Sequence, residues 1–153
     1  MERAWLSTEE ERAWTGLMGA VDSLPVAKFD EPAATPGGWL AKLVLYHVGA
    51  WCDECARHLA TSGSDAVPSE LQRSVEDEND LQAERSRDLT ADQVLSYVRS
   101  SRRRMLDEWR KLAEVTPAAW EWFHECGPVH YRRHESDLRN GVGASRGGVG
   151  SGP

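Results

Sequence analysis

The sequence predicts an all-α protein, an antiparallel four-helix bundle with a broken third region and a flexible C-terminal tail. Three observations support this class. Apolar residues recur every three or four positions in four long stretches, which is the period of a helix with one buried face. We find no convincing strand pattern and no internal repeat. Segments rich in proline, glycine and serine separate the stretches, as loops do in a helical bundle.

The first helix is expected to begin at Ser7 or Thr8, because Thr8 and Glu11 have the spacing of a capping box. Pro25 ends this helix, and residues 25–38 form a loop with three prolines and a glycine pair. The apolar positions of the helix are Trp14, Leu17, Met18, Val21 and Leu24.

A second helix is expected from about Gly38 to Thr61, with His47 on the flank of its apolar seam. Both Cys52 and Cys55 lie in that seam, in the middle of the helix. A thiol there packs as a small apolar group, so we interpret this pair as structural rather than as a redox or zinc motif. The seam consists of Ala41, Leu45, Val48, Cys52, Cys55 and Leu59.

The third region is broken into two segments. Ser69 is the candidate cap of an acidic segment with few apolar positions, and Thr90 is the candidate cap of a long helix that ends before Pro117. We expect no strand between them. This region therefore contributes one long helix and one short, polar one.

The last helix is expected from about Ala118 to Leu138, with an interruption at Gly127-Pro128. A proline inside a helix removes one backbone hydrogen bond and predicts a kink. From Asn140 onward the chain is rich in glycine and has no apolar periodicity. We therefore divide the chain into a helical bundle over residues 1–139 and a disordered, glycine-rich tail over residues 140–153.

Composition narrows the classes of function. The chain has 153 residues, which suits one domain, and a net charge of −7, which argues against general affinity for nucleic acid. No run approaches the roughly 20 apolar residues of a membrane span, and the first residues lack the apolar core of a signal peptide. The three cysteines predict no disulfide framework. We expect a cytoplasmic protein that acts on a small molecule and has no nucleic-acid or membrane partner. The sequence leaves open whether the protein forms a homodimer.

The residues that carry chemistry are histidines. His130 and His134 are four residues apart, so a helix places both imidazoles on one face, which also carries apolar residues. Buried imidazoles need partners for their ring nitrogens, and a divalent metal is the usual partner of such a pair. The rest of the chain must then supply a third ligand from another helix. A metal held there lowers the pKa of a bound water or thiol.

Two motifs carry a family resemblance, GGWLAKLVLYHVGAW around His47 and HYRRHESDL around the histidine pair. The chain resembles the DinB/YfiT-like superfamily, which includes the N-terminal domain of mycothiol-dependent maleylpyruvate isomerase. The resemblance implies a four-helix bundle with a divalent metal on His47, His130 and His134, for which zinc, nickel, iron and manganese are the candidates. It also implies a low-molecular-weight thiol, such as mycothiol, as a cofactor.

The leading hypothesis is a metal-dependent enzyme. It would activate water or a low-molecular-weight thiol against an electrophilic small molecule, in detoxification or natural-product self-resistance, as a thiol transferase or hydrolase. Trp51, one turn after His47, and Arg102, near the core side of its helix, are the expected substrate-binding residues. No residue is singled out as catalytic. The alternatives are a non-catalytic bundle that sequesters a small molecule, and a bundle that serves dimerisation.

Overall fold

The structure is a computed structural model that describes residues 2–61 and 75–143. In these two ranges every regular element is a helix or a helical turn. An isolated β-bridge between Pro32 and Leu40 ties together the ends of a loop. The predicted all-α class is therefore confirmed for this part of the chain.

The first helix, α1 (Glu2–Asp22), begins earlier than predicted. Thr8 does not cap it: the Thr8 hydroxyl donates a hydrogen bond to the carbonyl oxygen of Ala4 at 3.0 Å, one turn back along the same helix. The predicted start at Ser7 or Thr8 was wrong because the spacing of a capping box also occurs inside a helix. The apolar face continues toward the N-terminus through Leu6, which is fully buried.

A loop with one 3-10 turn, η1 (Val26–Lys28), leads to α2 (Ala41–Ala60). The loop is held by its own hydrogen bonds. The backbone N–H of Trp39 donates to Thr35 Oγ1 at 2.8 Å, and the Ala33 N–H donates to the Trp39 carbonyl at 2.7 Å. These bonds fix the position of Trp39 at the start of α2.

The third region forms a short helix, α3 (Val75–Ser86), and a long one, α4 (Ala91–Lys111). Thr90 caps α4 as predicted. Its Oγ1 accepts a hydrogen bond from the Gln93 N–H at 3.2 Å, and Gln93 Oε1 accepts one from the Thr90 N–H at 2.9 Å. The other predicted cap, Ser69, lies outside the described residues.

The last helical run has three parts, α5 (Pro117–His124), a π-helical turn η3 (Glu125–Val129) and α6 (His130–Gly143). The interruption falls on Gly127-Pro128, as predicted, and takes the form of a π turn that contains Pro128. The helix continues to Gly143, beyond the predicted end at Leu138. Residues 144–153 of the predicted tail lie outside the described residues.

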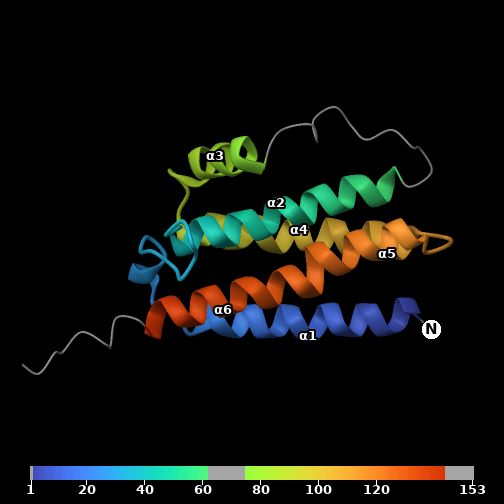
Figure 1. The fold of residues 1–153 in the computed structure, drawn as a ribbon, viewed down its shortest axis with the longest axis horizontal. Coiled ribbons are helices and arrows are strands. Elements are labelled where there is room, and N and C mark those ends of the chain that lie inside the picture. The colour runs from blue at the N-terminus through green and yellow to red at the C-terminus, as the bar shows by residue number, and fades with distance from the viewer. Residues whose placement is uncertain (1, 62–74, 144–153) are drawn as a thin grey trace, which may run out of the picture.

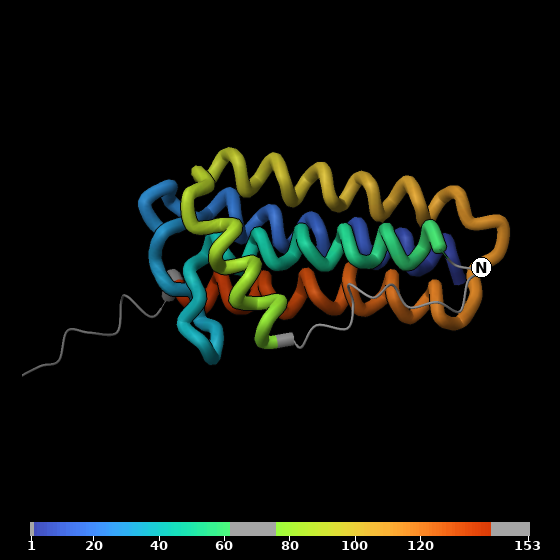
Figure 2. Tube along the Cα trace, turned by 90° about the horizontal axis from the view of Figure 1, so that it is seen from above, coloured from blue at the N-terminus to red at the C-terminus, as the bar shows by residue number. Residues whose placement is uncertain are grey.

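Four helical rods run along the long axis of the molecule: α1, α2, α4 and the run of α5, η3 and α6 (Figure 1). Figure 2 shows α3 crossing over α2 instead of running along it. The rods α2 and α4 point in the same direction, as two contacts show. Tyr46 of α2 stacks on Tyr97 of α4 with ring centroids 4.6 Å apart, and Asp53, farther along α2, pairs with Arg104, farther along α4. The expected antiparallel order therefore does not hold for these two helices. The segment that contains α3 returns the chain before α4 begins.

The core lies between the rods, where α2 packs along α4 and α1 along α6. Gly49 allows the close approach of α2 and α4, since a Cβ there would come within 2.7 Å of the Tyr97 ring and 3.3 Å of Val98 Cα. No helix in the described ranges is both long and apolar enough to span a membrane. The largest fully buried apolar side chains include Leu6, Leu17, Leu45, Leu59, Met105, Phe123 and Tyr131.

Candidate metal centre

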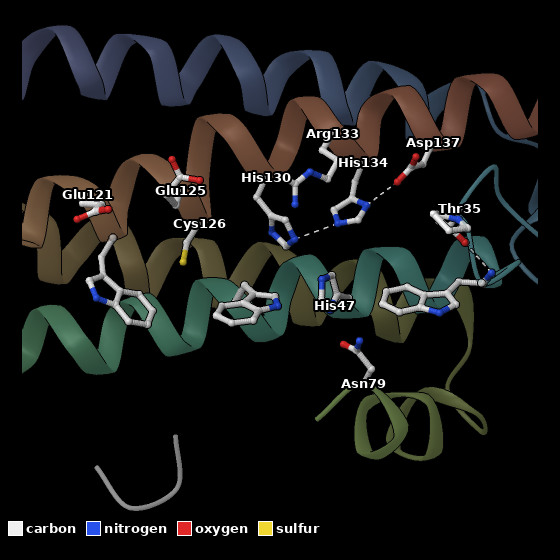
Figure 3. A pocket seen from close by; sticks show the side chains of 15 residues that line it. Thr35, His47, Asn79, Glu121, Glu125, Cys126, His130, Arg133, His134 and Asp137 are labelled. Atoms are coloured by element: carbon white, nitrogen blue, oxygen red, sulfur yellow. Dashed lines mark hydrogen bonds and ion pairs between the residues drawn. The ribbon is translucent and has the colours of Figure 1, made fainter. Parts of the chain in front are cut away.

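The three predicted histidines converge. His47 comes from the middle of α2, and His130 and His134 come from the first two turns of α6, just after the π turn (Figure 3). One ring nitrogen from each lies within 4.8 Å of the other two. The Nε2 atoms of His130 and His134 are 2.9 Å apart. All three side chains are buried, with exposed fractions of 6 to 8 %.

Burial keeps these imidazoles neutral. Desolvation lowers the pKa of His47 from 6.5 to about 4, although its hydrogen bond to Gln82 acts in the opposite direction. Desolvation also lowers the pKa of His130 and of His134, and the nearby charge of Arg133 adds to the effect on all three. A neutral imidazole offers the lone pair that a metal needs.

Two of the three rings are held from outside the cluster. His47 Nδ1 lies 2.8 Å from Gln82 Oε1, and His134 Nδ1 lies 2.9 Å from Asp137 Oδ2. These bonds direct Nε2 of both rings toward the centre, as outer partners of metal-binding histidines do. His130 Nδ1 is buried with no hydrogen-bond partner among the described residues.

The donor set fits a divalent metal. Three neutral imidazoles in contact are the ligands that zinc and other first-row metals prefer, and three protein ligands leave a coordination position open. A cation at the centre would give the Nε2 lone pairs a common partner.

The histidines line a cavity of about 830 Å³, large enough for a drug-sized molecule. Two indoles flank His47: the ring of Trp39 lies 5.1 Å and that of Trp51 6.2 Å from the His47 ring, between centroids. Trp51 therefore lies where the sequence placed it, beside the histidines. The remaining lining residues are Thr35, Pro36, Gly37, Asn79, Glu121, Trp122, Glu125, Cys126, Arg133 and Asp137.

Several of these residues were not singled out from the sequence. Asp137 carried a local signal that sequence reasoning could have used, since it follows His134 by three residues, one turn along the helix. Arg133 lies between the two histidines in sequence and has no hydrogen-bond or ion-pair partner among the described residues (Figure 3). Trp39 and Gln82 reach His47 only through the fold.

Arg102, the other expected substrate-binding residue, lies elsewhere. Its guanidinium binds the Glu10 carboxylate through two hydrogen bonds of 2.8 Å, pairs with Glu11, and lies 4.6 Å from the centre of the Trp14 ring. It does not line the cavity. The structure therefore corrects this expectation: the core-facing side of α4 at Arg102 meets α1, where a buried glutamate neutralises the charge.

The cysteines are buried and free. Cys52 Sγ lies 3.4 Å from the Tyr131 hydroxyl, and burial raises the pKa of this thiol to about 12. The pKa of Cys55 is also raised, chiefly by its contact with the Cys126 thiol and then by burial. Thiols with raised pKa values are poor nucleophiles, in agreement with a structural interpretation of Cys52 and Cys55.

The two remaining histidines stay outside the cluster. The ring of His58 stacks on Trp122 and that of His124 stacks on Trp120, with centroids 4.5 and 4.7 Å apart. Neither belongs to the predicted set of three histidines. The described residues contain one group of three potential metal ligands, and it is the predicted one.

The lowered pKa of His47 predicts how the metal-free protein responds to acid. In the unfolded chain His47 titrates near 6.5, so between about pH 4 and 6.5 the unfolded state binds more protons and stability rises with pH. Lowering the pH from 7 to 5 should cost about 2 kcal/mol through His47 alone. Urea unfolding with chelator present measures this loss. His47→Gln should flatten the dependence, and equal losses in both proteins would contradict a buried neutral imidazole.

Two comparisons with known proteins gave a match, one to a solved structure and one to a family model. The crystal structure of an uncharacterised protein from Escherichia coli UTI89 superposes with a TM-score of 0.78, covering 94% of each chain at 8% identity, which is a likeness of fold alone. No curated protein matches the chain. The family model described as the mycothiol maleylpyruvate isomerase N-terminal domain matches residues 11–134, a span that includes all three histidines. The chain therefore belongs to this family, within the DinB/YfiT-like superfamily.

Proposed function

We propose that this protein is a metal-dependent DinB-like enzyme that activates water or a low-molecular-weight thiol against an electrophilic small molecule. One observation carries the proposal: three buried, neutral imidazoles meet on the wall of a large cavity with aromatic sides. We also propose that the four helical rods form the superfamily's four-helix bundle. Detoxification and natural-product self-resistance are the settings in which such a reaction is needed.

The ligands would be His47, His130 and His134, and zinc, nickel, iron and manganese are the candidate metals. A divalent metal there supplies Lewis acidity, which lowers the pKa of a coordinated water or thiol. The family's name, with its mycothiol, supports a thiol as co-substrate. The reaction itself does not follow from family membership, since one fold hosts many reactions.

The chain's own residues bind, orient and shield. Trp39 and Trp51 offer flat apolar walls on both sides of His47, suited to a planar or apolar substrate. Gln82 and Asp137 hold two of the ligand rings in place. Arg133 supplies a positive charge near all three histidines, which favours an anionic group such as a thiolate or a carboxylate.

A turnover assay tests the proposal. Protein purified without a histidine tag is loaded with Zn²⁺ or Ni²⁺ and incubated with mycothiol and chlorodinitrobenzene. In this reaction the thiol sulfur bonds to the ring carbon, chloride leaves and the thiol proton passes to solvent. Epoxides and activated esters extend the panel to ring opening and hydrolysis. We expect many turnovers by the wild type and none by His47→Ala, whose folding is checked by circular dichroism.

The same assay addresses the competing function, a bundle that sequesters a small molecule. The volume of the cavity and its tryptophan walls suit such binding equally well. Stoichiometric retention of a compound without product would favour sequestration. Absence of metal after soaking with divalent ions would overturn the enzymatic proposal.

A further inference from the structure

α3 reaches the candidate metal centre through one buried side chain. The helix crosses over α2, outside the four rods (Figure 2), and its first turn is acidic. Gln82 is nevertheless only 2 % exposed, and its Oε1 lies 2.8 Å from Nδ1 of His47, a residue 35 positions earlier in the chain. A buried amide in contact with a candidate ligand has a structural cost, so its position calls for a function.

A second contact on α3 determines the direction of this hydrogen bond. Gln82 Nε2 donates to Glu78 Oε1 at 3.2 Å, one turn earlier on the same helix. A carboxylate only accepts hydrogen bonds, so the NH₂ group of the amide must face Glu78 and its oxygen must face His47. An amide oxygen accepts as well, and His47 Nδ1 must therefore carry the proton. The Nε2 atom of His47 is then left with a free lone pair.

We propose that Gln82 is a positioning residue that selects the Nδ1–H tautomer of His47 and so directs its Nε2 lone pair at the metal centre. This inference rests on the proposed function and deepens it, because it makes α3 part of the site. Glu78 acts one step farther out by fixing the orientation of the amide.

The three histidine rings differ in the hydrogen-bond partner of their Nδ1 atoms. Asp137 holds His134 with a carboxylate, Gln82 holds His47 with a neutral amide, and His130 Nδ1 has no partner among the described residues. A neutral partner orients His47 without adding a second negative charge to the buried site. Because the hydrogen bond made at one ring nitrogen decides which nitrogen carries the proton, removal of the amide should release the tautomer.

The test reads the tautomer directly. In metal-free, ¹⁵N-labelled protein, two-bond ¹H–¹⁵N spectra distinguish a protonated Nδ1 from a protonated Nε2, and His47→Gln assigns the signals. The wild type should show the proton of His47 on Nδ1. Gln82→Leu should move the population toward Nε2–H and weaken Zn²⁺ binding, measured by competition with a chromophoric chelator, by about 10- to 100-fold.

Two further variants separate positioning from general disturbance of the helix. Glu84→Leu makes the same side chain at an exposed position of α3 and should leave the tautomer and Zn²⁺ affinity unchanged. The double variant Glu78→Gln, Gln82→Glu exchanges the two side chains and so keeps the net charge. In it, the amide at position 78 donates to the carboxylate at position 82, and this carboxylate accepts from Nδ1 of His47. It should restore the Nδ1–H tautomer of His47 that Gln82→Leu loses.

Each outcome has a distinct meaning. A wild-type tautomer and wild-type affinity in Gln82→Leu would overturn the positioning role, and so would an equal loss in Glu84→Leu. Failure of the wild type to bind Zn²⁺ would overturn the proposed metal function. The tautomer measurement does not use metal, so in that case a shift in Gln82→Leu would still support the orientation of His47 by Gln82.

Discussion

His134→Ala is expected to lower the metal content from about one equivalent per chain to below about a tenth, because it removes one of three ligands. His134 is also the ring that Asp137 holds, at 2.9 Å. Elemental analysis of protein purified without a histidine tag measures the metal. Thermal unfolding gives a second readout, since Zn²⁺ at about 100 times its Kd should stabilise the wild type by about 2.7 kcal/mol and leave the variant unchanged.

The matched control for this prediction is His124→Ala. It also removes one imidazole, but His124 stacks on Trp120 outside the cluster, so this variant should keep its metal. Equal metal contents in the wild type and His134→Ala would show that the ion binds elsewhere. Loss of metal in both variants would point to an indirect effect on folding.

Arg102→Met is expected to lower the free energy of unfolding by about 3–5 kcal/mol, the usual cost of leaving a buried charge unpaired. Glu10, its partner on α1, is only 1 % exposed, and both carboxylate oxygens accept hydrogen bonds from the guanidinium at 2.8 Å. The substitution keeps much of the apolar stem and removes the charge. Urea unfolding followed by circular dichroism measures the loss.

A control variant and a double variant test whether the loss of stability comes from the unpaired buried charge. Arg110→Met removes an exposed ion pair with Asp107 on the same helix and should change stability by less than about 1 kcal/mol. Adding Glu10→Leu to Arg102→Met removes both buried charges and should recover most of the loss. If Arg102→Met were as stable as the wild type but bound substrate poorly, the result would contradict this prediction and would support a role of Arg102 in substrate binding, as expected from the sequence.

The candidate ligands could be found from the sequence because the signal is local. His130 and His134 are one helical turn apart, so any helix over these residues brings their rings together. His47 joins them because α2 has one broad apolar face, which must turn toward the other helices. The family resemblance then connected the two parts of the set.

The ends of the helices and their relative directions were harder to predict from the sequence. Thr8 has the spacing of a cap yet lies inside α1, because the side chains around it continue the buried face. The parallel course of α2 and α4 depends on the return of the chain through a region that contains α3, and residue periodicity carries no information about direction.

The sequence by itself determined the helical class, the cap at Thr90, the interruption at Gly127-Pro128 and the helical turn shared by the paired histidines, since each depends on residues close in the chain. Only the tertiary structure decided which partners the polar side chains have. Arg102 binds Glu10, 92 residues away, and His47 binds Gln82, 35 residues away. A long-range hydrogen bond forms where packing brings two groups together, and a local sequence pattern cannot predict which groups these are.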